Sequence, residues 1–248
     1  MPPIVPSATV PADAPLRWLR AGWRDFQAHP FPGLAHGAAL TVFGAVLLAW
    51  AHQQFWWLAG AFSGFLIVAP VLVTGLYAVS RAESRGEAVS WRTVWSVWAS
   101  LDRRLVAFGL LLSLAGTGWV LTSAALITAG SPVPIRQPAD FFRHVVMDPN
   151  WGLFELWVLL GGALAAPVFA SSVVAMPMLL DRPVSVWTAV RASWLAVANN
   201  PVAMGIWASL LMGLVLLGML MGLVGLVVVV PLLAHASWHA YADLVRVD

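Results

Sequence analysis

Four histidines are the residues whose type and spacing come nearest to a chemical site in this sequence. His235 and His239 lie four residues apart in PLLAHASWHAY, so in a helix they share a face and can hold one metal ion together. They cannot both be axial ligands of one haem, because those ligands approach the iron from opposite sides. His29 and His36 lie near the other end of the chain. His36 and His239 are a conceivable pair if the first and last apolar segments pack together.

The same histidines have a structural interpretation, in which each imidazole lies at the level of the lipid headgroups and bonds water or backbone groups. The chain has no cysteine, which excludes thiolate metal sites, iron–sulfur clusters, disulfides and cysteine nucleophiles. No acidic residue near His235 completes an obvious coordination set, although Asp243 follows His239 by four residues. We therefore expect no cofactor. A metal ion or haem at His29, His36, His235 and His239 is the alternative.

Charge inside a membrane is the best marker of a transport path or proton relay, and this chain has almost none. Glu155 is the exception, but it lies next to Trp151 and Trp157, where an interfacial carboxylate is hydrated. The sequence contains no serine-hydrolase elbow, HExxH motif, P-loop or dinucleotide fingerprint. These observations favour a role without catalysis.

Membrane helices must position these residues, since 60% of the chain is hydrophobic and only 10% is charged. Long apolar runs predict an all-α, polytopic membrane protein with six transmembrane helices, near 33–51, 56–80, 104–128, 152–180, 202–219 and 221–241. No charge occurs from Val202 to Ala234, and one helix of that length would be about 50 Å long against a hydrocarbon core of about 30 Å. The run must therefore turn back, and Gly218, Gly222 and Gly225 favour a hairpin there.

The distribution of arginines predicts the orientation. Six crossings place both termini on one side, together with every arginine except Arg136 and Arg143 of the outer loop 130–150. The positive-inside rule then predicts cytoplasmic termini in a bacterial inner membrane. Residues 1–15, with their five prolines, are expected to be a disordered tail, and residues 16–248 a single membrane domain. Within the outer loop, PADFFRHVVMD is expected to form a short amphipathic helix.

Three segments share an apolar pattern at i, i+3, i+7 and i+10, which is one face of an α-helix. They are Leu16, Leu19, Trp23 and Phe26; Trp91, Val94, Trp98 and Leu101; and Trp187, Val190, Trp194 and Val197. In each, the residue fourteen after the first anchor opens a predicted span. We interpret the segments as interfacial helices anchored by Trp23, Trp98 and Trp194, each followed by a transmembrane hairpin, so that the unit is repeated three times. Prolines in the second span of each unit predict helix kinks at Pro70, Pro177 and Pro231.

The segments LRAGWRDFQAHP and PLLAHASWHAYADLV, together with the proline-containing second spans, resemble bacterial integral membrane proteins catalogued as domain of unknown function 2189. The resemblance runs from about Leu16 to the C-terminus. Some relatives carry the label of a cytochrome c oxidase subunit, which implies haem ligands in several helices and a polar proton path. Most of the spans here lack histidine and no such path is present, so the resemblance implies a fold and a location more than an activity.

The sequence thus favours a structural, lipid-facing or complex-assembly role without catalysis. One alternative is a permease or channel for a small neutral or lipid-like solute. A second is a haem- or metal-binding membrane protein that uses the cytoplasmic-side histidines. The expected partners are membrane lipids, with a second copy of the chain or another membrane protein as further candidates. Nucleic acid is not expected, because the net charge is only +2.

Overall fold

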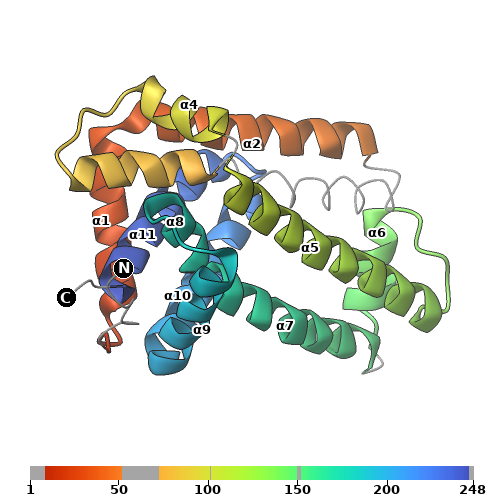
Figure 1. Cartoon of the computed structure of the whole chain (residues 1–248). Coiled ribbons are helices and arrows are strands. Elements are labelled where there is room, and N and C mark those ends of the chain that lie inside the picture. The colour runs from red at the N-terminus through yellow and green to blue at the C-terminus, as the bar shows by residue number, and fades with distance from the viewer. Residues whose placement is uncertain (1–8, 52–72, 101, 150–151, 246–248) are drawn as a thin grey trace. The chain divides into compact units, whose positions relative to one another are not determined.

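The computed structural model describes residues 9–51, 73–100, 102–149 and 152–245 (Figure 1). All regular secondary structure in these residues is helical, which confirms the all-α class. Pro70 and the first part of the second predicted span lie outside the described residues, whereas residues 73–84 are helical. The other elements are α1 (Ala14–Ala28), α2 (Pro30–Ala51), α4 (Trp91–Ala99), α5 (Arg103–Gly130), α6 (Pro138–Phe141), the π-helix η1 (Phe142–Val146), α7 (Leu153–Ser172), α8 (Ala175–Asp181), α9 (Val186–Asn199), α10 (Pro201–Leu220) and α11 (Leu226–Leu244).

Four helical segments are long and apolar enough to cross a bilayer: Pro30–Trp50, Arg103–Gly130, Leu153–Asp181 and Pro201–Leu220. Their outer faces carry large exposed apolar side chains such as Leu114, Leu121 and Leu159, as expected where lipid is the solvent. A polytopic membrane protein is therefore supported by four helices, and six spans stay a prediction. Helix α11, in the sixth predicted span, is not one of these four segments. Two histidines and Asp243 in its second half lower its mean hydropathy.

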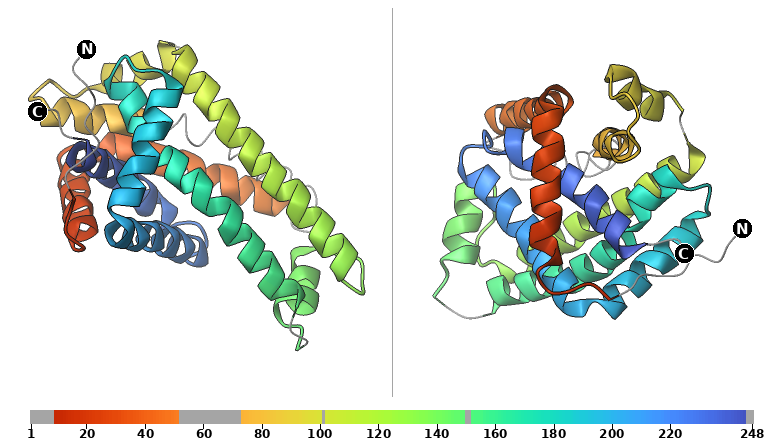
Figure 2. Two further views of the ribbon diagram at one scale, coloured as in Figure 1. Left: turned by 60° about the horizontal axis from the view of Figure 1, so that its bottom comes forward. Right: turned by 90° about the vertical axis from the view of Figure 1, so that its left-hand side faces the viewer.

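The chain divides into two compact units. The first unit takes its described residues from Met1–Val42, Pro70–Phe108 and Phe169–Asp248, and the second from Phe43–Ala69 and Gly109–Val168. In the first unit, α1 packs along α11 (Figures 1 and 2). A Cβ added at Gly22 of α1 would lie 2.5 Å from the backbone nitrogen of Ala236 in α11, so only a glycine lets the two backbones come this close.

The segment GLAHG at the start of α2 also packs within the chain. A Cβ at Gly33 would lie 2.8 Å from side-chain atoms of Phe26 and Pro231, and one at Gly37 would overlap the backbone of Val227. The first and last apolar helices, α2 and α11, are therefore close neighbours, as a pairing of His36 with His239 requires.

The hairpin predicted between Val202 and Ala234 is confirmed. Helix α10 ends at Leu220, a turn occupies 221–225, and α11 begins at Leu226. Gly222 and Leu223 both adopt left-handed backbone angles, with φ of 67° and 69°. The Thr41 hydroxyl donates to the Leu223 carbonyl at 3.1 Å, so α2 holds the strained residue in place.

The fourth predicted span is interrupted. Turn residues Val173 and Val174 separate α7 from α8, four residues before Pro177, which has no N–H to donate to the Val173 carbonyl. The freed N–H of Val174 donates to the Ser193 hydroxyl of α9 at 3.1 Å. A side chain of α9 thus bonds the buried Val174 N–H, which the interruption leaves without a helical partner.

The N-terminal end of the first unit is more ordered than predicted. Helix α1 begins at Ala14 rather than at Leu16, and the backbone N–H of Val10 donates to the Asn200 side chain at 2.7 Å. Three residues of the expected disordered tail are therefore held by contacts: Val10 through this hydrogen bond, and Ala14 and Pro15 through burial. Residues 1–8 lie outside the described part of the chain.

The second unit packs the outer loop against α5 and α7. Ile127, Ile135 and Val145 form its buried cluster, with Phe141 and Trp157 packed against them. The amphipathic helix predicted within PADFFRHVVMD is present as α6 followed by η1. Glu155 accepts a hydrogen bond from the Gly152 N–H at 2.8 Å and is therefore a cap at the start of α7.

Candidate functional site

Four side chains from three separate segments form a polar network inside the first unit: Asp25 of α1, Ser80 of the helix at 73–84, and His235 and His239 of α11. Nε2 of His239 lies 2.8 Å from Oδ2 of Asp25, and Nδ1 of His235 lies 2.7 Å from the Ser80 hydroxyl. Ser80 also lies close enough to Asp25 to help lower the pKa of that carboxyl. Ser80 and His235 are completely buried, so this network replaces water as their bonding partner.

The local sequence explains why these residues meet. On α1, the buried face is Trp18, Gly22 and Asp25, which are spaced three or four residues apart. On α11, His235 lies beside Ala236, the residue that Gly22 contacts. The close helix approach at Gly22 therefore brings the carboxylate one turn further along α1 within reach of α11.

The donors and acceptors of the polar network can be assigned from chemistry. An ionised Asp25 can only accept, so Nε2 of His239 donates to it. The Ser80 hydroxyl can either donate to Nδ1 of His235 or accept from it, and the second arrangement leaves a lone pair on Nε2 of the neutral ring. Nε2 of His235 is buried and has no hydrogen-bond partner among the described residues.

Asp25 is held in its ionised form. Burial raises the pKa of Asp25, but the hydrogen bonds from His239 and Ser80 and the charges of His239 and His235 lower it, and the net result is a pKa below the ordinary 3.8. The Asp25 carboxylate is thus the electrostatic centre of the polar network.

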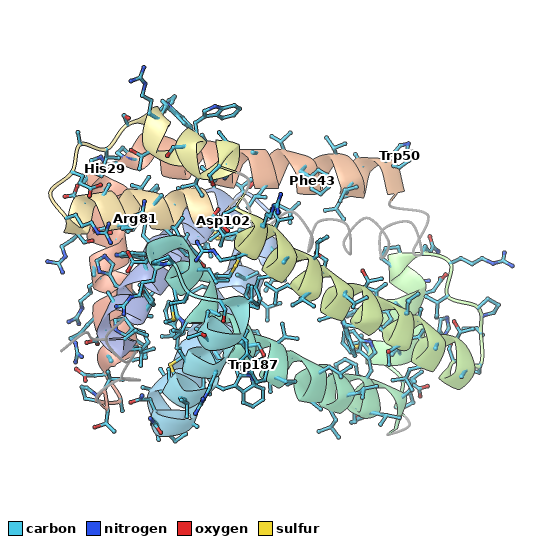
Figure 3. The ribbon with its side chains drawn as sticks, viewed as in Figure 1. His29, Phe43, Trp50, Arg81, Asp102 and Trp187 are labelled. Carbon is cyan, nitrogen blue, oxygen red and sulfur yellow. The ribbon has the colours of Figure 1, made fainter. Side chains whose placement is uncertain are left out.

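The remaining two histidines have partners of their own. Nε2 of His29, which is labelled in Figure 3, lies 2.7 Å from the Glu83 carboxylate. Nδ1 of His36 donates to the Pro32 carbonyl at 2.6 Å, and its ring lies against Trp98 with centroids 5.3 Å apart. His29 and His36 therefore each form a contact outside the polar network. In the described part of the chain, no group of three or more His, Asp or Glu side chains is arranged to hold a metal ion.

A second set of polar contacts adjoins the polar network on α11. The Tyr241 hydroxyl donates to Asp181 at 2.8 Å and accepts from Nε of Arg182 at 2.9 Å, while Arg85 pairs with the same aspartate. The indole N–H of Trp18 donates to Asp243 at 3.1 Å. These bonds fix the end of α11 to α8, to the turn after residue 84 and to α1.

This arrangement serves packing better than chemistry. Ser80 has no exposed surface, so it is unsuited to act as a nucleophile. His239 uses Nε2 for Asp25. Among the predicted metal ligands, Nε2 of His235 fits best, because a ligating imidazole commonly has its other ring nitrogen hydrogen-bonded, as Nδ1 of His235 is to Ser80.

The predicted anchors and kinks have distinct surroundings. Trp23 is 41% exposed and Trp194 is 47% exposed, with the Trp194 N–H donating to Ser171 at 2.9 Å, whereas Trp98 is half-buried against His36. Pro231 is buried inside α11, and Pro177 is buried in α8.

Sequence reasoning found the histidines but missed Asp25 and Ser80. The available signal was an aspartate spaced three residues from Gly22 on a helix otherwise rich in arginine, but nothing in the local pattern identifies a partner more than two hundred residues away.

Comparison with known proteins gives a family and no characterised relative. The family model described as "Predicted integral membrane protein (DUF2189)" matches residues 57–181. This match is narrower than the resemblance noted from the sequence, since LRAGWRDFQAHP and PLLAHASWHAYADLV lie outside it. No curated protein and no solved structure matches the chain.

Proposed function

We propose, since this chain belongs to the predicted integral membrane protein family DUF2189, that it is a multi-pass inner-membrane protein with a non-catalytic, lipid-facing role in organising a membrane complex. The observation that carries this proposal is that buried polar side chains and exposed tryptophans have separate places in the structure. Buried polar groups are used to join helices, while Trp23, Trp187 and Trp194 point outward from short helices that precede long apolar ones.

The proposed topology has six spans with both termini in the cytoplasm. In support, three short helices precede three long ones among the described elements: α1 before α2, α4 before α5, and α9 before α10. This order is what a threefold repeat of interfacial helix and hairpin requires. The unequal distribution of arginine supports the orientation.

Reconstitution tests the proposed role against the permease alternative. The full chain, purified in mild detergent and placed in proteoliposomes, should show no saturable flux of small neutral solutes above protein-free vesicles. It should instead copurify with lipid and with a membrane protein partner or a second copy. Saturable flux that depends on the protein would replace this proposal with a permease.

A metal-binding role is the second candidate, and the observation that favours it is Nε2 of His235, which is buried and has no hydrogen-bond partner among the described residues. If the candidate is correct, purified protein contains haem or a stoichiometric transition metal that His235→Ala removes. His29→Ala is a suitable control, because His29 is engaged by Glu83 at the surface. Colourless, metal-free protein would eliminate this candidate.

A further inference from the structure

Five arginines of the first unit form no side-chain hydrogen bond or ion pair with any described residue: Arg20, Arg24, Arg92, Arg103 and Arg191. All five are exposed. The acidic residues near them are already engaged, since Asp13 pairs with Arg17, Asp25 with His239, and Asp102 with Arg104. Uncompensated positive charge therefore lies on the surface of α1, α9 and the segment around α4.

Two of these arginines occupy the same position relative to exposed aromatic and aliphatic side chains. On α1, Arg20 follows Leu16 by four residues and precedes Trp23 by three. On α9, Arg191 follows Trp187 by four residues and precedes Trp194 by three. At helical spacing, each arginine lies on the same outward stripe as its two apolar neighbours, which are 41–76% exposed.

This stripe has the chemistry of a lipid headgroup site. Indole rings are most stable at the boundary between acyl chains and headgroups, and a guanidinium can bind a phosphate with two parallel hydrogen bonds. A soluble protein surface would not combine an unpaired arginine with two exposed large apolar groups on one helix stripe at two separate places. The surplus positive charge favours anionic lipids over zwitterionic ones.

We propose that α1 and α9 bind the phosphate groups of anionic phospholipids through Arg20 and Arg191, with Trp23 and Trp194 seated at the acyl boundary. This inference rests on the proposed membrane role and adds the class of lipid to it. The two sites have the same arrangement of residues on different helices. We expect each site to select the surrounding lipid independently of the other.

Native mass spectrometry of the full chain in neutral detergent tests the proposal, with phosphatidylglycerol and phosphatidylcholine of identical acyl chains as competing probes. We expect wild-type protein to retain phosphatidylglycerol preferentially, and Arg20→Gln with Arg191→Gln to reduce that preference by about fivefold for each arginine at low salt. The matched control is Arg136→Gln with Arg143→Gln, which removes the same charge from the outer loop. Thermal unfolding of each variant should match that of the wild type, because all four side chains are exposed.

Three results would overturn the proposal. They are an unchanged phosphatidylglycerol preference in the Arg20→Gln and Arg191→Gln variant, an equal loss in the outer-loop control, and displacement of the lipid by soluble glycerol phosphate at the same concentration. An unchanged preference would assign the stripe to a protein partner instead. Saturable solute flux would overturn the proposed function while leaving this lipid preference intact, so the two failures are distinguishable.

Discussion

Asp25 is the residue on which the polar network depends, because it accepts a hydrogen bond from His239 and is only 8% exposed between α1 and α11. Removing its charge weakens that bond in a place from which water is largely excluded. The resulting loss of stability is larger than the contribution of an average hydrogen bond, because the groups that formed the bond remain shielded from water.

Asp25→Asn should lower the free energy of unfolding by about 1–3 kcal/mol, because a neutral amide oxygen cannot replace the ionised carboxylate that accepts from His239. Thermal or denaturant unfolding in detergent measures the loss. Asp13→Asn is the matched control, since its ion pair with Arg17 has side chains 66% and 46% exposed and should contribute less than about 1 kcal/mol. Equal effects of the two substitutions would contradict the assigned role.

The same carboxylate predicts how stability depends on pH. The pKa of Asp25 is lower in the folded protein than the ordinary 3.8, so the unfolded chain binds this proton more readily. Its contribution is therefore complete above pH 3.8 and is lost as the pH falls through the folded-state value. The Asp102 carboxyl adds a loss of the same sign, because the hydrogen bond from Arg104 lowers its pKa against the opposing effect of burial.

Melting temperatures measured between pH 5 and pH 3 test this prediction. Wild-type protein should lose stability more steeply than Asp25→Asn over that range, and the two curves should converge at the acid end. Parallel curves would show that Asp25 titrates alike in the folded and unfolded chains.

At the scale of single residues, composition and spacing identified His235 and His239 but not their partners. The spacing of four residues correctly places both on one helix, yet His235 bonds Ser80 and His239 bonds Asp25. Side-chain partners are decided by which helices meet. That information lies in the close approach of Gly22 and Ala236 and not in the periodicity of either helix.

At the scale of elements, the contact between α1 and α11 depends on the absence of a side chain. Gly22→Ala should destabilise the protein by about 1–3 kcal/mol, since its Cβ would meet backbone atoms of Ala236 that cannot rotate away, and this exceeds the gain of about 1 kcal/mol in helix propensity. Unfolding in detergent measures the change.

Gly205 of α10 supplies the matched control, because a Cβ there would meet nothing within 4 Å. Gly205→Ala should be neutral or stabilising through the same helix propensity. Opposite signs for the two substitutions would establish the close approach, whereas a stabilising Gly22→Ala would argue against it.

Much of the element structure follows from the sequence because long apolar runs admit few alternatives in lipid. The predicted starts of the first, third and fifth spans lie within three residues of α2, α5 and α10. The turn after α10 was predictable because one helix could not accommodate an uncharged run of that length. The interruption at Val173 is harder to locate from the sequence, because Pro177 removes the hydrogen bond to the carbonyl four residues before it.

At the scale of the whole molecule, reporter fusions test the arrangement of the spans. A fusion after Asp248 should report the cytoplasm, and one inserted between residues 136 and 148 should report the opposite side, because this loop has two arginines and the proposed cytoplasmic side has eleven. A fusion between α8 and α9 at residues 183–185 should match the C-terminal one. The same side for all three would refute the six-span arrangement.

The contact between Asp25 and His239 joins residues separated by 214 positions, so α1 docks against a helix that is synthesised long after it. Until α11 has been made, the charge of Asp25 has no permanent partner. The junction of α1 and α11 therefore forms late in folding, and its rate depends on closing a long loop.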